Sequence, residues 1–342
     1  MNIKYLLSFL LVLIFSGCGG DSEIVDNPNE KPDTDKSAAI DFTQPIRGVN
    51  WADKRDNFAD DFLVPSGLAS ADNYYRTQTK ALGVINGFIS NMKANTVRLP
   101  VNHATVTGYW WSGYQGAIDV ALVKGMRVIL ACWEGKDAKD GKVDNMTEFW
   151  TMWSKIIETY GDERGVYFEI INEPYGYNYT DLTALYEQWL VKFPKVPHSR
   201  ILVGGTGFCE DVSKVGADPR FSNCLLSLHN YAFWAIRTSN EWRKSWINAL
   251  GGFASRTVVT EFGSTMTQGK NYNSTEAGDN EIDYIQASTN LFREQGIQSV
   301  YWPGLRDDDW YSLQKLDYSN YTLSTTNASG LSRVQHGWGL NP

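Results

Sequence analysis

Residues 166–174 read VYFEIINEP, a short run of apolar and aromatic residues that ends in Asn172, Glu173 and Pro174. Seven other short runs of apolar and β-branched residues occur along the chain, and this composition is typical of buried β-strands. The eight predicted strands span residues 46–50, 96–99, 127–133, 166–172, 201–204, 225–230, 257–261 and 299–302.

Helical patterns lie between most of these runs. The predicted helices span residues 82–94, 117–124, 147–160, 182–193, 241–250, 281–295 and 328–338, and no clear helix separates the fifth strand from the sixth. Eight strand–helix units in about 300 residues fit a closed barrel better than an open, doubly wound sheet. We therefore predict an α/β fold, a single (β/α)8 TIM barrel.

The composition excludes several classes of protein. The chain has 342 residues, 42% of them hydrophobic, so it can bury a full core. Its formal net charge of −8 opposes binding to the phosphates of nucleic acid. Four Cys and four His offer little for a disulfide scaffold or a soft-metal site, and the sequence motifs of nucleotide cofactors are absent. We predict no cofactor, no metal and no nucleic-acid partner.

The first 17 residues are typical of a secretory signal peptide, with one Lys before an apolar run over residues 5–15. Phe15, Ser16, Gly17 and Cys18 resemble the lipobox of bacterial lipoproteins. That resemblance implies cleavage before Cys18 and lipidation of its thiol, which would anchor an exported protein to the outer membrane or the cell surface. The alternative is an ordinary signal peptide with an incidental cysteine.

The chain is predicted to have three segments. The signal peptide covers residues 1–17, and the lipidated Cys18 begins a flexible tether over residues 18–42. Residues 19–41 contain seven acids against two lysines and no apolar period, so we expect them to pack against nothing. Residues 43–342 form the barrel domain, which we expect to be a monomer.

Two glutamates end predicted strands and are candidates for chemistry. Reactive groups in such barrels lie at the carboxyl ends of the strands, where Glu173 follows strand four and Glu261 ends strand seven. Two carboxylates that face one pocket are what glycosidic cleavage requires. The alternative for either Glu alone is a rim residue paired with Arg or Lys. Glu169 lies four residues before Glu173, and we predict that it forms a buried polar pair.

With their neighbours, these residues resemble glycoside hydrolase family 5, the cellulase family of retaining barrel glycosidases. The resemblance spans roughly residues 45–310. Arg98 matches the arginine of strand two, and Asn172, Glu173 and Pro174 match the acid/base strand. His229 and Tyr231 match the His-x-Tyr after strand six. Glu261 matches the nucleophile on strand seven, and Trp302 matches the tryptophan that closes strand eight.

The resemblance implies hydrolysis of polysaccharides or oligosaccharides by double displacement. Glu261 would be the nucleophile, kept ionised by Arg98 and the Tyr231 hydroxyl. Glu173 would be the acid/base, with its pKa tuned by His229.

Two further positions would bind the reacting sugar. Asn172 would hydrogen-bond the 2-hydroxyl, and Trp302 would stack on the sugar ring. The alternatives for these supporting residues are a core salt bridge for the Arg, a structural His and a packed core Trp.

The sequence departs from the family at two places. Strand three commonly ends in His but here ends in Cys132, Trp133 and Glu134, and His103 stands where the family often has Trp. An aromatic wall of Trp133, Trp110 and Trp111 would narrow the pocket around one terminal sugar. This predicts exo action or an unusual sugar such as arabinofuranose or galactofuranose. The alternative is an open cleft, with Trp133 packed between helix and strand.

Other candidates follow the predicted strands. Seven Trp lie at or beyond strand ends and could stack on a long chain or enclose a short pocket: Trp51, Trp110, Trp111, Trp133, Trp234, Trp302 and Trp310. Asp308, in the run 307–309, could bind sugar hydroxyls or Ca²⁺, although acidic loops are usually only solvated. Cys209 and Cys224 could pair, and two free thiols are the default.

Two functions remain from the sequence. One is a retaining glycoside hydrolase, either a β-glycanase or an exo-acting glycosidase. The other is a non-catalytic surface lipoprotein that binds glycans. A degenerate binder would be expected to have lost Glu173, Glu261 or Arg98, and all three are present.

Overall fold

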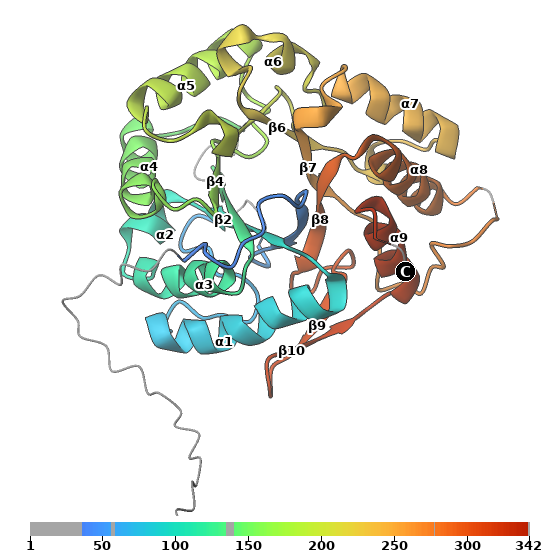
Figure 1. Ribbon diagram of the computed structural model, residues 1–342, viewed down its shortest axis with the longest axis horizontal. Coiled ribbons are helices and arrows are strands. Elements are labelled where there is room, and N and C mark those ends of the chain that lie inside the picture. Colours follow the sequence, from blue (N-terminus) through green and yellow to red (C-terminus); the bar gives the residue numbers. More distant parts are fainter. Residues whose placement is uncertain (1–35, 56–58, 135–139, 277, 341–342) are drawn as a thin grey trace, which may run out of the picture. The chain divides into compact units, whose positions relative to one another are not determined.

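The structure, a computed structural model, describes residues 36–55, 59–134, 140–276 and 278–340. Eight parallel strands form a closed barrel in chain order, and β8 pairs with β1 to close it. The prediction of a single TIM barrel is confirmed (Figure 1). The strands are β1 (Arg47–Trp51), β2 (Thr96–Val101), β3 (Arg127–Cys132), β4 (Val166–Glu169), β5 (Ile201–Gly204), β6 (Leu225–His229), β7 (Thr257–Phe262) and β8 (Gln298–Leu305).

Helices surround the barrel, as Figure 1 shows. They are α1 (Tyr74–Gly87), α2 (His103–Thr107), α3 (Trp111–Val123), α4 (Met146–Tyr160), α5 (Tyr179–Lys192), α6 (Ser213–Ala217), α7 (Ser239–Leu250), α8 (Asn280–Gln295) and α9 (Ala328–Gly337). The short α6 lies between β5 and β6, where no clear helix was predicted. Among the described residues, no helix is long and apolar enough to cross a membrane.

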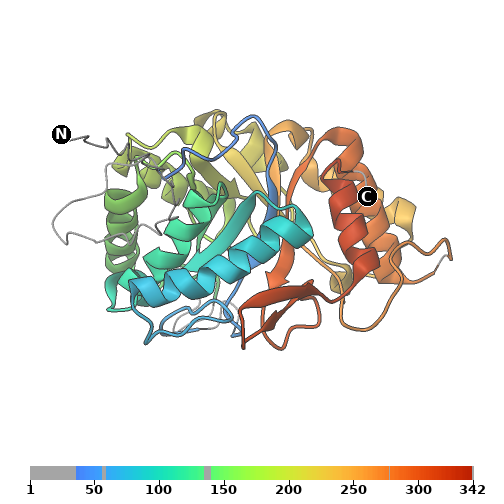
Figure 2. The same cartoon turned by 60° about the horizontal axis from the view of Figure 1, so that its bottom comes forward.

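An antiparallel hairpin of β9 (Gln314–Asp317) and β10 (Thr322–Thr325) follows the barrel and was not predicted. It lies along α1 in both ribbon views (Figures 1 and 2). Gly83 and Gly87 permit this close approach, because a Cβ at either would meet Tyr321 or Leu323.

The barrel interior is layered from apolar to polar. A buried apolar cluster fills the end where the strands begin: Ile46, Ile129, Leu202, Val258 and Val300. Further along the barrel, inward positions on β2, β6 and β7 are polar and buried: Arg98, Ser227 and Thr260. Because strand side chains alternate, the same strands turn apolar residues outward to the helices. The polar layer supports the groups at the carboxyl ends of the strands.

The folded domain begins earlier than predicted. Residues 1–35, with Cys18 and most of the proposed tether, lie outside the described residues. Lys36 pairs with Asp119 at 2.6 Å, the Gly165 amide donates to the Ser37 hydroxyl at 2.8 Å, and Ile40 is buried. The prediction that residues up to 41 pack against nothing is therefore wrong for residues 36–41. The acidic composition of the segment concealed this short anchoring stretch.

Candidate active site

The β4 end places the predicted acid/base in an unusual backbone conformation. Asn172 and Glu173 follow β4, and the Asn172 amide donates to the Cys132 carbonyl at 2.8 Å. Glu173 has φ of 45°, in the left-handed region that costs a side-chain-bearing residue about 1–2 kcal/mol. The Tyr175 amide donates to the Glu173 carbonyl at 2.8 Å and closes the turn. The left-handed backbone at Glu173 thus gives its side chain a direction different from the one that a continued strand would give it.

Glu261 on β7 is held by a cation and a hydroxyl. Its Oε1 accepts from Arg98 Nη1 at 2.7 Å, and its Oε2 accepts from the Tyr231 hydroxyl at 2.7 Å. Burial favours a raised pKa, but the charges of His229 and Arg98 and these hydrogen bonds outweigh it and lower the pKa of Glu261 below its usual range. The carboxylate is therefore ionised near neutral pH, as a nucleophile must be.

Arg98 connects both catalytic strands while only 1% of it is exposed. Its Nε and Nη2 bind Glu169 at 2.6 and 3.1 Å, which confirms Glu169 as a member of a buried polar pair. Nη2 also donates to Asn172 Oδ1 at 2.7 Å, and Nη1 donates to Asn50 Oδ1 at 2.8 Å. Since Arg98 occupies the Asn172 oxygen, the Nδ2 group of that amide is left to donate to a substrate hydroxyl.

His229, at the end of β6, lies between the two glutamates. Its Nδ1 is 3.0 Å from Glu173 Oε1 and 3.6 Å from Glu261 Oε2. Burial opposes protonation, but the charge of Glu261 and the hydrogen bond and charge of Glu173 prevail against burial and against Arg98, and they raise the pKa of His229. One carboxylate oxygen from each Glu and one His229 nitrogen all lie within 4.8 Å of one another. This proximity fits the separation of about 5–5.5 Å between carboxyl groups in retaining enzymes.

The same three side chains are the one group among the described residues with three metal-ligand atoms so close together. Arg98, at 2.7 Å from Glu261, already supplies the positive charge that a cation would bring. We therefore assign the trio to the cleavage reaction and not to a metal site.

A cavity of about 650 Å³ opens above these residues. The predicted residues that line it are Asn172, Glu173, His229, Tyr231, Trp234, Glu261 and Trp302. Aromatic side chains form part of its wall: the Tyr175 and Phe208 rings stack with centroids 4.7 Å apart, and Phe208 lies 5.6 Å from Trp234. A flat apolar wall next to two carboxylates suits a sugar chain.

The family model for cellulase (glycosyl hydrolase family 5) matches residues 66–304. The chain belongs to this family. It is 24% identical over 211 residues to Endoglucanase Z of Dickeya dadantii (strain 3937), a match that covers 60% of this chain and 46% of that protein. The chain thus spans about half the length of this curated relative.

Solved structures of a β-glucanase and an endoglucanase share the fold. The β-glucanase SdGluc5_26A from Saccharophagus degradans, in complex with cellotetraose, aligns with a TM-score of 0.63 and 18% identity, covering 86% of this chain and 88% of that chain. The catalytic domain of Thermobifida fusca endoglucanase Cel5A, also with cellotetraose, aligns at 0.58 with 19% identity, covering 86% and 92%. At these sequence identities, the structural similarity shows only that the barrel fold is shared.

Trp51, Trp110 and Trp111 of this family 5 chain are buried away from the cavity. Trp51 is fully buried and its Nε1 donates to the Ser66 carbonyl at 2.8 Å. Trp110 and Trp111 are 1% and 4% exposed in the helical layer, so they do not wall the pocket. The prediction of a narrow pocket for one terminal sugar is therefore not supported, because it depended on Trp110 and Trp111 as walls. Trp110 and Trp111 face the core because α3 begins at Trp111 and buries this end against the barrel.

Trp133 has a role that neither alternative anticipated. Its ring lies 5.9 Å from that of Trp302, tilted by 48°, and both are buried in one cluster with Tyr231. Trp302 lines the cavity and Trp133 does not. Trp133 thus supports the predicted stacking ring and takes no part in the cavity surface.

Two polar predictions also lie outside the cavity. His103 Nδ1 is 3.3 Å from Glu148 Oε2, in a separate small hollow. Asp308 is exposed and has φ of 60°, while its neighbour Asp309 lines the cavity and pairs with Arg306 at 2.8 Å. Cys209 and Cys224 are free, buried thiols.

Of the run 307–309, Asp309 lines the cavity. The sequence reasoning missed several other residues that line it: Glu134, Tyr175, Phe208, Glu210, Asn230, Phe233, Arg306 and Tyr311. All lie within nine residues after a strand end, in the loops where barrel enzymes bind their ligands. The aromatic residues among them could have been found by treating exposed loop aromatics like the tryptophans.

Proposed function

We propose that the protein is a retaining β-glucanase that cleaves glucan chains internally. The observation that carries this proposal is the pairing of Glu173 with an ionised Glu261 around His229: one carboxylate oxygen of each Glu and one His229 ring nitrogen lie within 4.8 Å of one another. A non-catalytic glycan binder, the alternative from another class, would need no such ionised group beside a second carboxylate.

The geometry supports two displacements. In the first, Glu261 attacks the anomeric carbon while Glu173 gives its proton to the glycosidic oxygen, so that the leaving chain departs as an alcohol and a glycosyl ester forms. In the second, the Glu173 carboxylate takes a proton from water, whose oxygen attacks the anomeric carbon and releases Glu261. His229, at 3.0 Å from Glu173, orients the acid/base for both steps.

Glucan is the proposed substrate class because the relative is named an endoglucanase and two similar solved structures hold cellotetraose. Internal cleavage is favoured over exo action because the tryptophans expected to close the pocket are buried elsewhere. The walls of the cavity also continue, through Arg306 and Asp309, into neighbouring hollows. A chain can therefore extend beyond the reacting sugar.

The cellular setting is part of the proposal. The lipobox-like residues before Cys18 support export and a lipid anchor, and the acidic segment after it supports a tether that ends near residue 36. We propose a monomer whose partner is the carbohydrate substrate.

Hydrolysis of a soluble β-glucan tests the function. Rapid loss of viscosity with few new reducing ends is expected from internal cleavage. NMR of the first product should show the β-anomer, because double displacement retains the configuration. Slow loss of viscosity with a monosaccharide as first product would contradict internal cleavage.

A further inference from the structure

We propose that Trp310, on the loop after β8, forms a second carbohydrate-binding surface that holds a distant part of the same glucan chain. This inference rests on the proposed β-glucanase function and adds a binding site outside the catalytic cavity. The site lies over the β8 loop and the β9–β10 hairpin.

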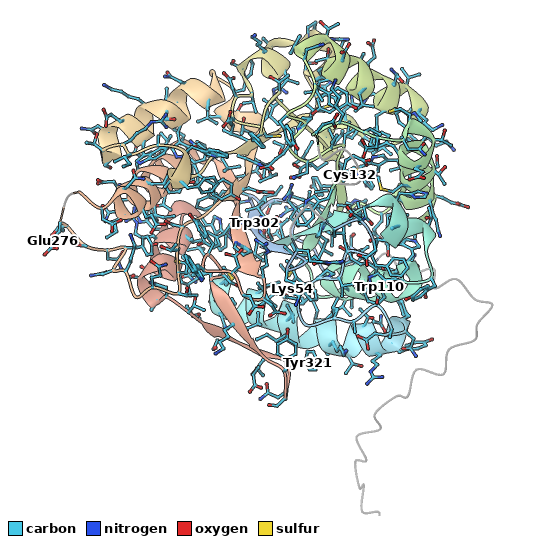
Figure 3. The ribbon with its side chains drawn as sticks, turned by 180° about the vertical axis from the view of Figure 1, so that it is seen from behind. Lys54, Trp110, Cys132, Glu276, Trp302 and Tyr321 are labelled. Atoms are coloured by element: carbon cyan, nitrogen blue, oxygen red, sulfur yellow. The ribbon has the colours of Figure 1, made fainter. Side chains whose placement is uncertain are left out.

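Two hollows connect this surface with the catalytic cavity. One, of about 840 Å³, is lined by Lys54, Asp308, Trp310 and Tyr318 among others. A second, of about 540 Å³, also contains Lys54 and Trp310. Both share Arg306 and Asp309 with the catalytic cavity, so the three spaces adjoin. In Figure 3, Lys54 lies between Trp302, near the barrel centre, and Tyr321 on the hairpin.

Trp310 presents its indole to solvent from a fixed backbone. Its side chain belongs to a residue that is 65% exposed, and its carbonyl accepts from the amides of Met266 and Thr267 at 2.7 and 3.1 Å. These bonds tie the β8 loop to the loop after β7. A large apolar ring held in water in this way is suited to cover the apolar face of a sugar.

The groups around the indole complete a site for sugar hydroxyls. Lys54 and Asp308 offer a donor and acceptors in the same hollow, and Tyr318, 54% exposed, offers a second ring. The junction to the catalytic cavity is rigid, because the Arg306 guanidinium binds Asp309 at 2.8 Å and the Lys54 carbonyl at 3.0 Å.

The chemistry of cleavage gives the chain a direction. Glu173 protonates the leaving oxygen, so the leaving chain lies on the Glu173 side of the cavity, along Tyr175 and Phe208. Glu261 and Trp302 hold the sugar that stays on the enzyme. The retained part of the chain therefore continues past Arg306 towards Trp310.

Release of the aryl group from aryl β-glycosides of increasing length tests the site, because in the complex that releases this group all glucosyl units lie in the retained part. The ratio of kcat/KM for the aryl cellopentaoside to that for the aryl cellobioside should fall about five- to tenfold in Trp310→Ala. Trp310→Phe should restore part of the ratio. Tyr109→Ala is the matched control, since Tyr109 is 75% exposed and lies outside all three hollows.

The outcomes separate the two proposals. A fall in Trp310→Ala, with Tyr109→Ala like the wild type, supports the site. An unchanged ratio in Trp310→Ala overturns it, while turnover of the aryl glycosides leaves the β-glucanase function standing. If the wild type cleaves no β-glucoside of any length, the function fails and this inference fails with it.

Discussion

Arg98 binds two buried carboxylates at once, so its loss should affect both stability and catalysis. In Arg98→Met, Glu169 would remain buried without its cation, and the free energy of unfolding should fall by about 3–5 kcal/mol. Burial already favours a raised pKa for Glu261, and Arg98 is one of the charges that keep it low. Without Arg98 that pKa rises, so the acid limb of the pH–rate profile should move to higher pH.

Urea unfolding and the pH dependence of kcat/KM on an aryl glycoside measure these effects. Arg243→Met is the control, because its pair with Glu294 at 2.6 Å is half-exposed and should contribute little. An acid limb that stays in place would mean that Arg98 does not control the Glu261 charge.

The two catalytic glutamates should differ in their response to leaving groups. Glu261→Gln should abolish turnover of every substrate, because no glycosyl ester can form. Glu173→Ala should lower turnover of unactivated substrates by about 10²–10⁴-fold but spare the first step for good leaving groups. Azide should then restore turnover by replacing water in the second step. Equal losses on activated and unactivated substrates would exclude Glu173 as the acid.

Single residues also show what sequence reasoning could reach. The motif residues around Glu173 and Glu261 were found because the chemistry demands those types at strand ends. Trp51 was misplaced although strand alternation contains the answer: Asn50 reaches Arg98 inside the barrel, so its neighbour faces outward. The alternation of inward and outward side chains along β1 predicts the position of Trp51 better than its residue type does.

At the scale of elements, strands were easier to predict than helices. β5 matches its predicted range, whereas the helix predicted over residues 82–94 is α1 over Tyr74–Gly87, followed by a π-helical turn over Phe88–Met92. The first turns of α1, residues 74–80, consist of polar and tyrosine side chains and give little apolar periodicity. Its start is instead fixed by Asn73, whose side chain accepts from the Arg76 amide at 2.9 Å. The conformations of the loops depend on tertiary packing, so the sequence did not predict which loop residues line the cavity.

The segment over residues 36–41 should act as part of the domain. A protein that begins at residue 35 should keep the full free energy of unfolding, because Lys36, Ser37 and Ile40 remain. A protein that begins at residue 43 should lose about 2–3 kcal/mol, chiefly from exposure around Ile40. Urea denaturation of both forms measures the difference, and Ile40→Ala in the longer form isolates the apolar part. Equal stability of the two truncated forms would show that this stretch adds nothing.

At the scale of the whole molecule, the barrel chemistry and the membrane attachment should be separable. Cleavage before Cys18 would remove the apolar run over residues 5–15 and leave the acyl chains as the source of membrane affinity. The net charge of −8 opposes binding to anionic lipid surfaces, so it cannot replace them. The lipid should therefore decide location, and the barrel should decide activity.

Cys18→Ser should lack incorporated lipid and leave the membrane fraction, while its β-glucanase activity per molecule stays that of the wild type. Labelling with a radioactive fatty acid, followed by fractionation and an activity assay of each fraction, measures all three properties. Ser16→Thr is the control, because it changes a neighbour but keeps the thiol that accepts the lipid. If Cys18→Ser still sediments with membranes without lipid, attachment arises from another part of the chain and the lipobox interpretation is wrong.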